Sequence, residues 1–390
     1  MKDIFLTFLR LGCYAFGGPT AHMGYFHEEF VKRRKWLSEA DYADTVALCQ
    51  FLPGPSSSQA GFAIGLDRGG ILGAFLAWVG FTLPSAFLMI AFALGLERAG
   101  DLSIAGWVAG LKLVAVAVVA NAAWSMAKSL CPDRSRVTIA ALVTLALLLA
   151  SDPLAQLLAI LLGAAAGYLL YRNQDHTQAA QPSKQSGSKR LGSVYLALFF
   201  LLLAGLPIAA QLFPANQTLE TGNAFYRAGS LVFGGGHVVL PLLDSYTVQR
   251  GWIDESSFLA GYGAAQALPG PLFAFSSFLG AGIDHGPRGI AGGLYALVMI
   301  YLPAWLLVLG AIPFWDRLRK VNAARAALLG ANAAVVGLLF AALYDPIWRS
   351  SVQGNLSFGF ALAAFVLLKF WKAPPWLIAA LGAGLGHLLL

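Results

Sequence analysis

RLGCYAFGG at residues 10–18 and RAGSLVFGG at residues 227–235 share one pattern, in which an arginine, a glycine and Phe-Gly-Gly keep the same spacing. A second pattern follows each copy, as QFLPGP at residues 50–55 and QALPGP at residues 266–271. The copies start 217 and 216 residues apart, so the chain contains an internal duplication. Glycine and proline break helices. Such breaks at corresponding places in two apolar halves are typical of a transporter substrate site.

The composition indicates that the chain lies in a lipid bilayer. Hydrophobic residues make up 58% of the chain and charged residues only 12%, which is far more apolar than a soluble protein of this length requires. Because the hydrocarbon core of a bilayer contains no water, long apolar stretches must cross it as helices. We expect such helices at residues 70–96, 106–127, 137–150, 154–171, 191–213, 288–312, 326–343, 356–371 and 375–390.

Basic residues predict which loops face the cytoplasm. The net charge of +7 is spread over short loops between apolar stretches, which argues against a nucleic-acid-binding surface. The positive-inside rule places the basic loops in the cytoplasm, namely residues 32–35, 128–136, 172–190, 317–325 and 369–372. The loops expected outside are residues 97–101, 151–153, 214–223 and 345–355.

Matching loops of the two halves have opposite charge bias. Residues 32–35 carry four basic side chains and the matching 247–251 carry one, whereas 97–101 carry one and the matching 317–325 are basic. We therefore expect an all-α integral membrane protein with an inverted-topology repeat of two homologous halves. Each half would contain two Gly/Pro-broken helical hairpins followed by four transmembrane helices. The expected units are a first repeat at 1–171, a basic cytoplasmic linker at 172–190, one connecting transmembrane helix at 191–213, and a second, inverted repeat at 214–390.

The broken segments are residues 5–31, 40–66, 224–248 and 256–283. Topology requires each to begin and end on the same side of the membrane. Two arrangements satisfy this requirement: a re-entrant hairpin or two short crossings. In either case a helix that begins inside the membrane presents free backbone N–H groups and the positive end of its dipole, which together form a ready anion site.

Hydroxyl groups favour the segment at the first Pro-Gly-Pro motif as the main binding site. Ser56, Ser57 and Ser58 follow the first Pro-Gly-Pro, whereas the second is followed by apolar residues and then Ser276 and Ser277. Helix capping is the alternative role for the three serines. The expected substrate-binding residues are Arg10, Gly17, Gly18, Gln50, Pro53, Gly54, Pro55, Ser56, Ser57, Ser58, Arg227, Gly234, Gly235, Gln266, Pro269, Gly270 and Pro271.

Two arginines and two histidines are the charged or titratable candidates near the breaks. Arg10 and Arg227 precede the breaks, and their forked guanidinium groups could match one dianion, unless each extends to the membrane interface instead. His22 and His237 lie just past the breaks and could carry a coupled proton, with hydrogen-bonded packing as the alternative. The three cysteines show no metal-ligand spacing and read as reduced packing residues, so we expect neither metal nor cofactor.

The duplicated Phe-Gly-Gly and Leu-Pro-Gly-Pro motifs resemble the chromate ion transporter family in its long, two-domain form. The resemblance covers nearly the whole chain outside the linker, although Pro19 of the first motif is replaced by Gly236-His237 in the second copy. It implies a bacterial inner-membrane protein, with a cytoplasmic N-terminus, that exports chromate by alternating access and also recognises sulfate. Partners would then be the oxyanion and the bilayer, with no nucleic acid; a homodimer is one arrangement.

The membrane potential favours export. Moving a dianion out of a negative cytoplasm gains ~4.6 kcal/mol per ~100 mV, whereas import would need coupling to protons or sodium ions. Three alternatives stay open: a proton-coupled importer of sulfate or another oxyanion, an anion channel, and an intramembrane lipid-phosphate phosphatase. The phosphatase would need a base or a metal-binding carboxylate near the serines, and residues 45–66 contain no acidic residue. We therefore do not expect an enzyme.

Overall fold

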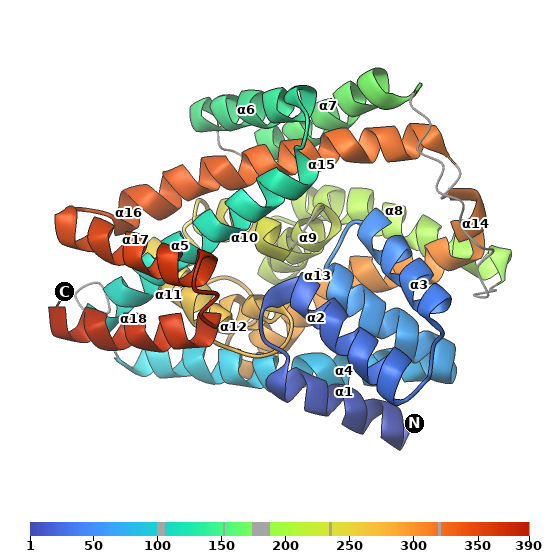
Figure 1. The fold of residues 1–390 in the computed structure, drawn as a ribbon, viewed down its shortest axis with the longest axis horizontal. Helices are drawn as coiled ribbons and strands as arrows, with labels where there is room; N and C mark the ends of the chain where they lie inside the picture. Colours follow the sequence, from blue (N-terminus) through green and yellow to red (C-terminus); the bar gives the residue numbers. More distant parts are fainter. Residues whose placement is uncertain (100–105, 151–152, 174–187, 234–235, 319–320, 390) are drawn as a thin grey trace.

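The computed structural model describes residues 1–99, 106–150, 153–173, 188–233, 236–318 and 321–389, all as helices and connecting turns with no β-strand in these ranges (Figure 1). Most of the linker at 172–190 therefore lies outside the described residues. The elements of the first half are α1 Lys2–Tyr14, α2 Gly18–Phe26, η1 His27–Arg33, α3 Glu39–Phe51, α4 Ser56–Ala99, α5 Gly106–Leu130, α6 Arg134–Leu149 and α7 Pro153–Tyr171, followed by α8 Lys189–Leu212.

The elements after α8 repeat this order of broken and continuous helices. They are α9 Gln217–Ser230, η2 Gly236–Val238, α10 Val239–Thr247, α11 Glu255–Gln266, η3 Leu272–Ala274, α12 Phe275–Gly282, α13 Gly289–Ala311, η4 Ile312–Phe314, α14 Trp315–Leu318, α15 Asn322–Ala342, η5 Leu343–Trp348, α16 Arg349–Ser351, α17 Asn355–Lys369 and α18 Pro375–Leu389.

Six helices of the described chain are long and apolar enough to cross a membrane, in agreement with an integral membrane protein. Three of the nine expected spans form helices below the length needed to cross a membrane: α6 has 16 residues, and α17 and α18 have 15 each. At 1.5 Å per residue these helices are about 22–24 Å long, less than the ~30 Å of hydrocarbon. The six long helices are Ser56–Arg98, Gly106–Leu130, Leu154–Tyr171, Lys189–Leu212, Gly289–Leu318 and Asn322–Ser351.

The helices break at the Gly/Pro motifs. At the two Pro-Gly-Pro motifs the glycines adopt φ values of +125° (Gly54) and +93° (Gly270), a region that residues with a side chain rarely occupy. Another turn lies inside α4, where Gly69 and Gly70 leave the helical conformation. A Cβ atom at Gly65 would lie 2.5 Å from the carbonyl oxygen of Gly73, so the two parts of α4 fold back against each other.

In the first half, both broken segments begin and end at one cluster of side chains. The Arg34 guanidinium pairs with Asp3 at the start of α1 at 2.7 Å and lies 5.3 Å from the centre of the Trp36 ring. Arg68, at the end of the first part of α4, joins the same cluster, with its guanidinium 5.3 Å from the centre of the Trp36 ring. Each broken segment is therefore a hairpin whose two ends lie together.

The second half builds the same cluster from the corresponding positions. Arg250 pairs with Glu220 at 2.8 Å and lies 5.5 Å from the Trp252 ring. His285 takes the place of Arg68: it stacks on Trp252 with ring centres 4.2 Å apart and bonds Glu220 at 2.8 Å. The duplication seen in the sequence is thus also present in the contacts that close the hairpins.

The tips of these hairpins meet across the two halves. The backbone N–H of Gly54 donates to the carbonyl oxygen of Val232 at 2.7 Å, and the N–H of Gly270 donates to that of Ala15 at 2.9 Å. Val232 and Ala15 both immediately precede the phenylalanine of the Phe-Gly-Gly motif. Each Pro-Gly-Pro break is therefore bonded to the Phe-Gly-Gly break of the other half.

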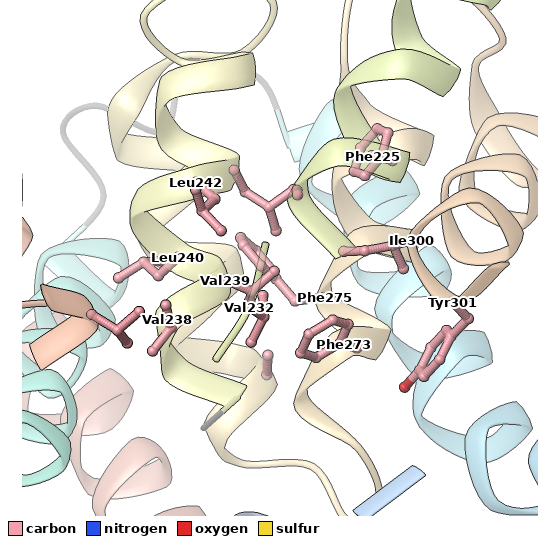
Figure 2. Packing of buried hydrophobic residues seen from close by; sticks show 14 of the residues in the cluster. Phe225, Val232, Val238, Val239, Leu240, Leu242, Phe273, Phe275, Ile300 and Tyr301 are labelled. Carbon is pink, nitrogen blue, oxygen red and sulfur yellow. The ribbon is translucent and has the colours of Figure 1, made fainter. Parts of the chain in front are cut away.

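Apolar side chains fill the space around these tips. Figure 2 shows Phe225 from α9, Val232 from the segment just after α9, Val239 from α10, Phe273 from η3 and Ile300 from α13 converging in one buried cluster. All five are at most 1% exposed, which holds the broken ends in fixed positions.

Glycine also allows the long helices to approach closely. A Cβ atom at Gly110 of α5 would overlap the carbonyl oxygen of Gly382 of α18, and one at Gly330 of α15 would overlap that of Gly163 of α7. Figure 1 shows α7 alongside α15 at the top of the molecule and α18 below α5 at its left. Small residues at crossings are the usual means of packing membrane helices.

Candidate functional site

A cavity of about 660 Å³ lies where the broken helices meet α5. Its wall combines residues of the breaks with residues of α5, α15, α17 and the start of α18. The lining residues are Gly17, Gly18, Pro19, Met23, Val46, Cys49, Gln50, Leu52, Gly54, Ser56, Val118, Asn121, Ala122, Ser125, Met126, Ser129, Leu130, Gly236, His237, Ala265, Gln266, Leu268, Gly270, Leu272, Asn332, Leu368 and Pro375.

Four helical segments begin at this cavity. Gly18, Ser56, Gly236 and Leu272 are the first residues of α2, α4, η2 and η3, and all four line it. η2 runs directly into α10 and η3 into α12. Because the first turn of a helix has N–H groups without intrahelical partners and a partial positive charge, four such ends around one cavity favour an anion.

Four side-chain amides add neutral hydrogen-bond donors. Gln50 and Gln266 occupy equivalent positions of the duplicated motif, and Asn121 and Asn332 come from α5 and α15. The Nε2 atom of Gln266 is buried and has no hydrogen-bond partner among the described residues. An unpaired buried donor is costly, so a ligand that accepts its hydrogen bond would be favoured.

The wall itself carries no formal charge. Of the described residues that line the cavity, none is Asp, Glu, Lys or Arg, and His237 is the one imidazole. The Nδ1 atom of His237 lies 2.8 Å from the Tyr262 hydroxyl. The absence of a carboxylate from this wall removes the main repulsive interaction that an anion would meet.

Eight of the residues singled out from the sequence line the cavity. They are Gly17, Gly18, Gln50, Gly54, Ser56, Gln266, Gly270 and His237. The amides of Gly54 and Gly270 are already bonded to Val232 and Ala15, so these glycines shape the wall and do not offer free donors.

The serine cluster is divided between the cavity and the protein interior. Ser57 is buried and lies 3.2 Å from Nδ1 of His22, and Ser58 lies 3.4 Å from the Tyr301 hydroxyl. His22 is 1% exposed, and its other ring nitrogen contacts the Ala15 carbonyl oxygen at 3.1 Å. His22 and Ser57 therefore have packing partners away from the wall. The prolines Pro53, Pro55, Pro269 and Pro271 are likewise not among the lining residues.

The two arginines lie away from the cavity. Arg10 is exposed on α1, and Arg227 lies over the Tyr246 ring, 5.6 Å from its centre. Neither is a lining residue, so the structure does not bring the two guanidinium groups together around one ligand. Gly234 and Gly235 lie outside the described residues.

The sequence prediction missed a polar face of α5. Asn121, Ser125 and Ser129 are spaced four residues apart, which puts them on one side of the helix, and all three line the cavity. This spacing inside an apolar span was the available signal. The prediction followed the Gly/Pro breaks, and α5 has none.

Comparison with known proteins gives one consistent result. The model of the chromate transporter family matches residues 2–168 and again residues 219–387. A chromate transport protein of Cupriavidus metallidurans is 27% identical over 99% of this chain and 92% of its own length. Those of Pseudomonas aeruginosa (28%; 95% and 87%) and, named as probable, Synechococcus elongatus (27%; 95% and 90%) are similarly close. No solved structure matches the chain significantly.

Proposed function

This chain belongs to the chromate transporter family, a family of transporters and not of enzymes, and from that premise we propose that it exports chromate across the bacterial inner membrane. The observation that carries the proposal is the cavity at which four helix starts and four amides converge on an uncharged wall. Such a wall offers hydrogen bonds to all oxygens of a tetrahedral dianion. Sulfate has the same shape and charge and is the expected competitor. The curated relatives named above are described as chromate transport proteins.

Alternating access around this cavity is the proposed mechanism. The two hairpin pairs would be inverted repeats, with units at 1–171 and 214–390 joined by the linker 172–190 and the helix 191–213. In support, each half closes its hairpins with its own charged cluster, and the hairpin tips bond across the halves. Relative motion of the halves would then move the open side of the cavity from one membrane face to the other.

Flux measurements test export directly. We expect inside-out vesicles containing the protein to take up radiolabelled chromate when their interior is positive, with sulfate competing. Setting the potential and the pH gradient separately distinguishes export without a coupled ion from a proton-coupled importer. Turnover per molecule distinguishes a carrier from a channel, which passes ions far faster. A complete lack of chromate movement in either direction would rule out the proposal.

Cysteine labelling tests the inverted topology. We expect single cysteines in 32–35, 172–190 and 317–325 to react with an impermeant reagent only from the cytoplasmic side, and those in 214–223 and 345–355 only from outside, because of the charge bias of the loops. Cys13 is exposed and free, so it is first replaced by serine. Labelling of 247–251 from the same side as 32–35 would show that the halves are not inverted.

A change of charge on the wall tests the site. Gln266→Glu keeps the shape of the side chain but adds a negative charge, and we expect it to raise the half-saturation concentration for chromate about tenfold or more at pH 8. Arg10→Gln is the control, because Arg10 is exposed and away from the cavity. We expect this variant to stay within about twofold of the wild type, on the scale of a surface change. A raised half-saturation concentration in Arg10→Gln together with a wild-type value in Gln266→Glu would show that the arginines, and not the cavity wall, bind the anion.

A further inference from the structure

The uncharged wall leaves open which group supplies positive charge to a bound dianion. A dianion loses a large hydration energy on entering an apolar protein, and helix ends and amides replace only part of it. A cation within reach of the wall would supply the remainder and would also discriminate dianions from monoanions. The arginines of the duplicated motif are not at the wall, so such a cation has to come from a neighbouring element.

Lys369 has the required position. It is the last residue of α17, and its Nζ donates to the Ser125 hydroxyl at 3.0 Å, across the contact between α17 and α5. Ser125 lines the cavity, as does Leu368, the residue before the lysine. The ammonium therefore lies within one hydrogen bond of the wall.

The charge of Lys369 is not neutralised by a neighbour. Within the part of the chain that the structure describes, no carboxylate pairs with this lysine, whereas Arg34, Arg136, Arg250 and Arg349 all form ion pairs. Its side chain is half-buried, and the Ser125 hydroxyl to which it is bonded is exposed to solvent. Its one hydrogen bond goes to a neutral hydroxyl, which a stronger acceptor would readily displace.

We propose that Lys369 is the cation that recognises the dianion. In the empty cavity its ammonium rests on Ser125. When a dianion is bound, the ammonium turns on its flexible side chain to an oxyanion oxygen, and the Ser125 hydroxyl, no longer bonded to the lysine, becomes a further donor beside the Asn121 amide. The inference rests on the proposed function because it names the group that gives this same cavity its preference for dianions.

A structural role makes a different prediction. A lysine in the last turn of α17 also interacts favourably with the negative end of that helix. In that case its removal would lower stability without changing which anion is preferred. Lys372 is the matched control, since it is exposed just beyond the end of α17 and carries the same charge but is not among the residues that line the cavity.

The experiment compares Lys369→Met, Lys369→Arg and Lys372→Met at equal membrane abundance. Chromate half-saturation is measured in vesicles, together with inhibition by sulfate, a dianion, and by nitrate, a monoanion. We expect Lys369→Met to raise the half-saturation concentration by about tenfold or more, as loss of a hydrogen bond to a charged group does, and to lose the preference for sulfate over nitrate. Lys369→Arg should keep that preference, and Lys372→Met should match the wild type.

Sulfate binding to the purified proteins tests the role of Lys369 independently of chromate transport. It is followed as the rise in thermal midpoint with sulfate concentration, which does not require transport. Absence of chromate flux in the wild type would defeat the proposed function, yet loss of the sulfate response in Lys369→Met would still support the role of the lysine. A Lys369→Met protein with wild-type half-saturation and anion preference, whatever its stability, would overturn it.

Discussion

We expect Gly54→Leu to abolish chromate flux, and Gly270→Leu to do the same. Each glycine has a left-handed φ, which costs a residue with a side chain about 1–2 kcal/mol. A Cβ atom at Gly54 would lie 2.8 Å from Nε2 of Gln59 and 3.3 Å from Cβ of Ala304. A Cβ atom at Gly270 would lie 2.9 Å from Oγ of Ser85. In both cases the substitution strains the tip whose N–H bonds the other half of the protein.

This geometry refines an asymmetry suggested by the sequence. From the serines after the first motif we would expect Gly54→Leu to remove anion binding and Gly270→Leu to hinder movement between states. In the structure the two glycines are equivalent, since each donates its N–H to the carbonyl before the other half's Phe-Gly-Gly. We therefore expect both variants to lose flux together with sulfate binding, because the cavity wall passes through both tips.

Gly251→Leu is the control for backbone strain alone. Gly251 also has a positive φ, +71°, but a Cβ atom there would meet nothing within 4 Å. We expect this variant to keep most of its flux. Flux and equilibrium sulfate binding are measured at equal abundance of folded protein. Wild-type binding in Gly54→Leu would show that the Pro-Gly-Pro tip does not form the anion site.

We expect Gly229→Val to remove most folded protein from the membrane. Gly229 is the first glycine of the RAGSLVFGG pattern and lies on α9. A Cβ atom there would overlap the carbonyl oxygen of Ile300 in α13. Its counterpart Gly12 has the same role, with Phe81 of α4 as the neighbour at 2.6 Å. A backbone atom cannot rotate away as a side chain can, so the helices must separate. We expect the free energy of unfolding to fall by about 3 kcal/mol or more, a large part of the total.

Gly205→Val on α8 is the matched substitution, because a Cβ atom at Gly205 would meet nothing within 4 Å. Size-exclusion profiles and thermal unfolding in detergent measure both variants. Gly205→Val should resemble the wild type. A Gly229→Val protein that accumulates normally and unfolds at the wild-type temperature would disprove the close α9–α13 crossing.

Local sequence features located the helices and their breaks. The apolar stretch at 106–127 became α5, Gly106–Leu130, and the Pro-Gly-Pro motifs ended α3 and α11. These features are local because about 20 apolar residues suffice to favour a spanning helix, and proline and glycine act on their own turn of backbone. The expected spans at 356–371 and 375–390 likewise correspond to α17, Asn355–Lys369, and α18, Pro375–Leu389.

The duplication pointed to the residues Gln50, Gln266 and the Pro-Gly-Pro glycines that line the candidate cavity, but only the tertiary structure decided which other side chains form its wall. Arg10 and Asn121 are both polar residues within apolar helices, and the rotation of each helix about its axis exposes the first and turns the second into the cavity. That rotation depends on packing between helices far apart in the chain, such as the glycine crossings of α5 with α18. The contact between Lys369 and Ser125 likewise joins residues 244 positions apart, a pairing that follows from helix packing and that no local pattern specifies.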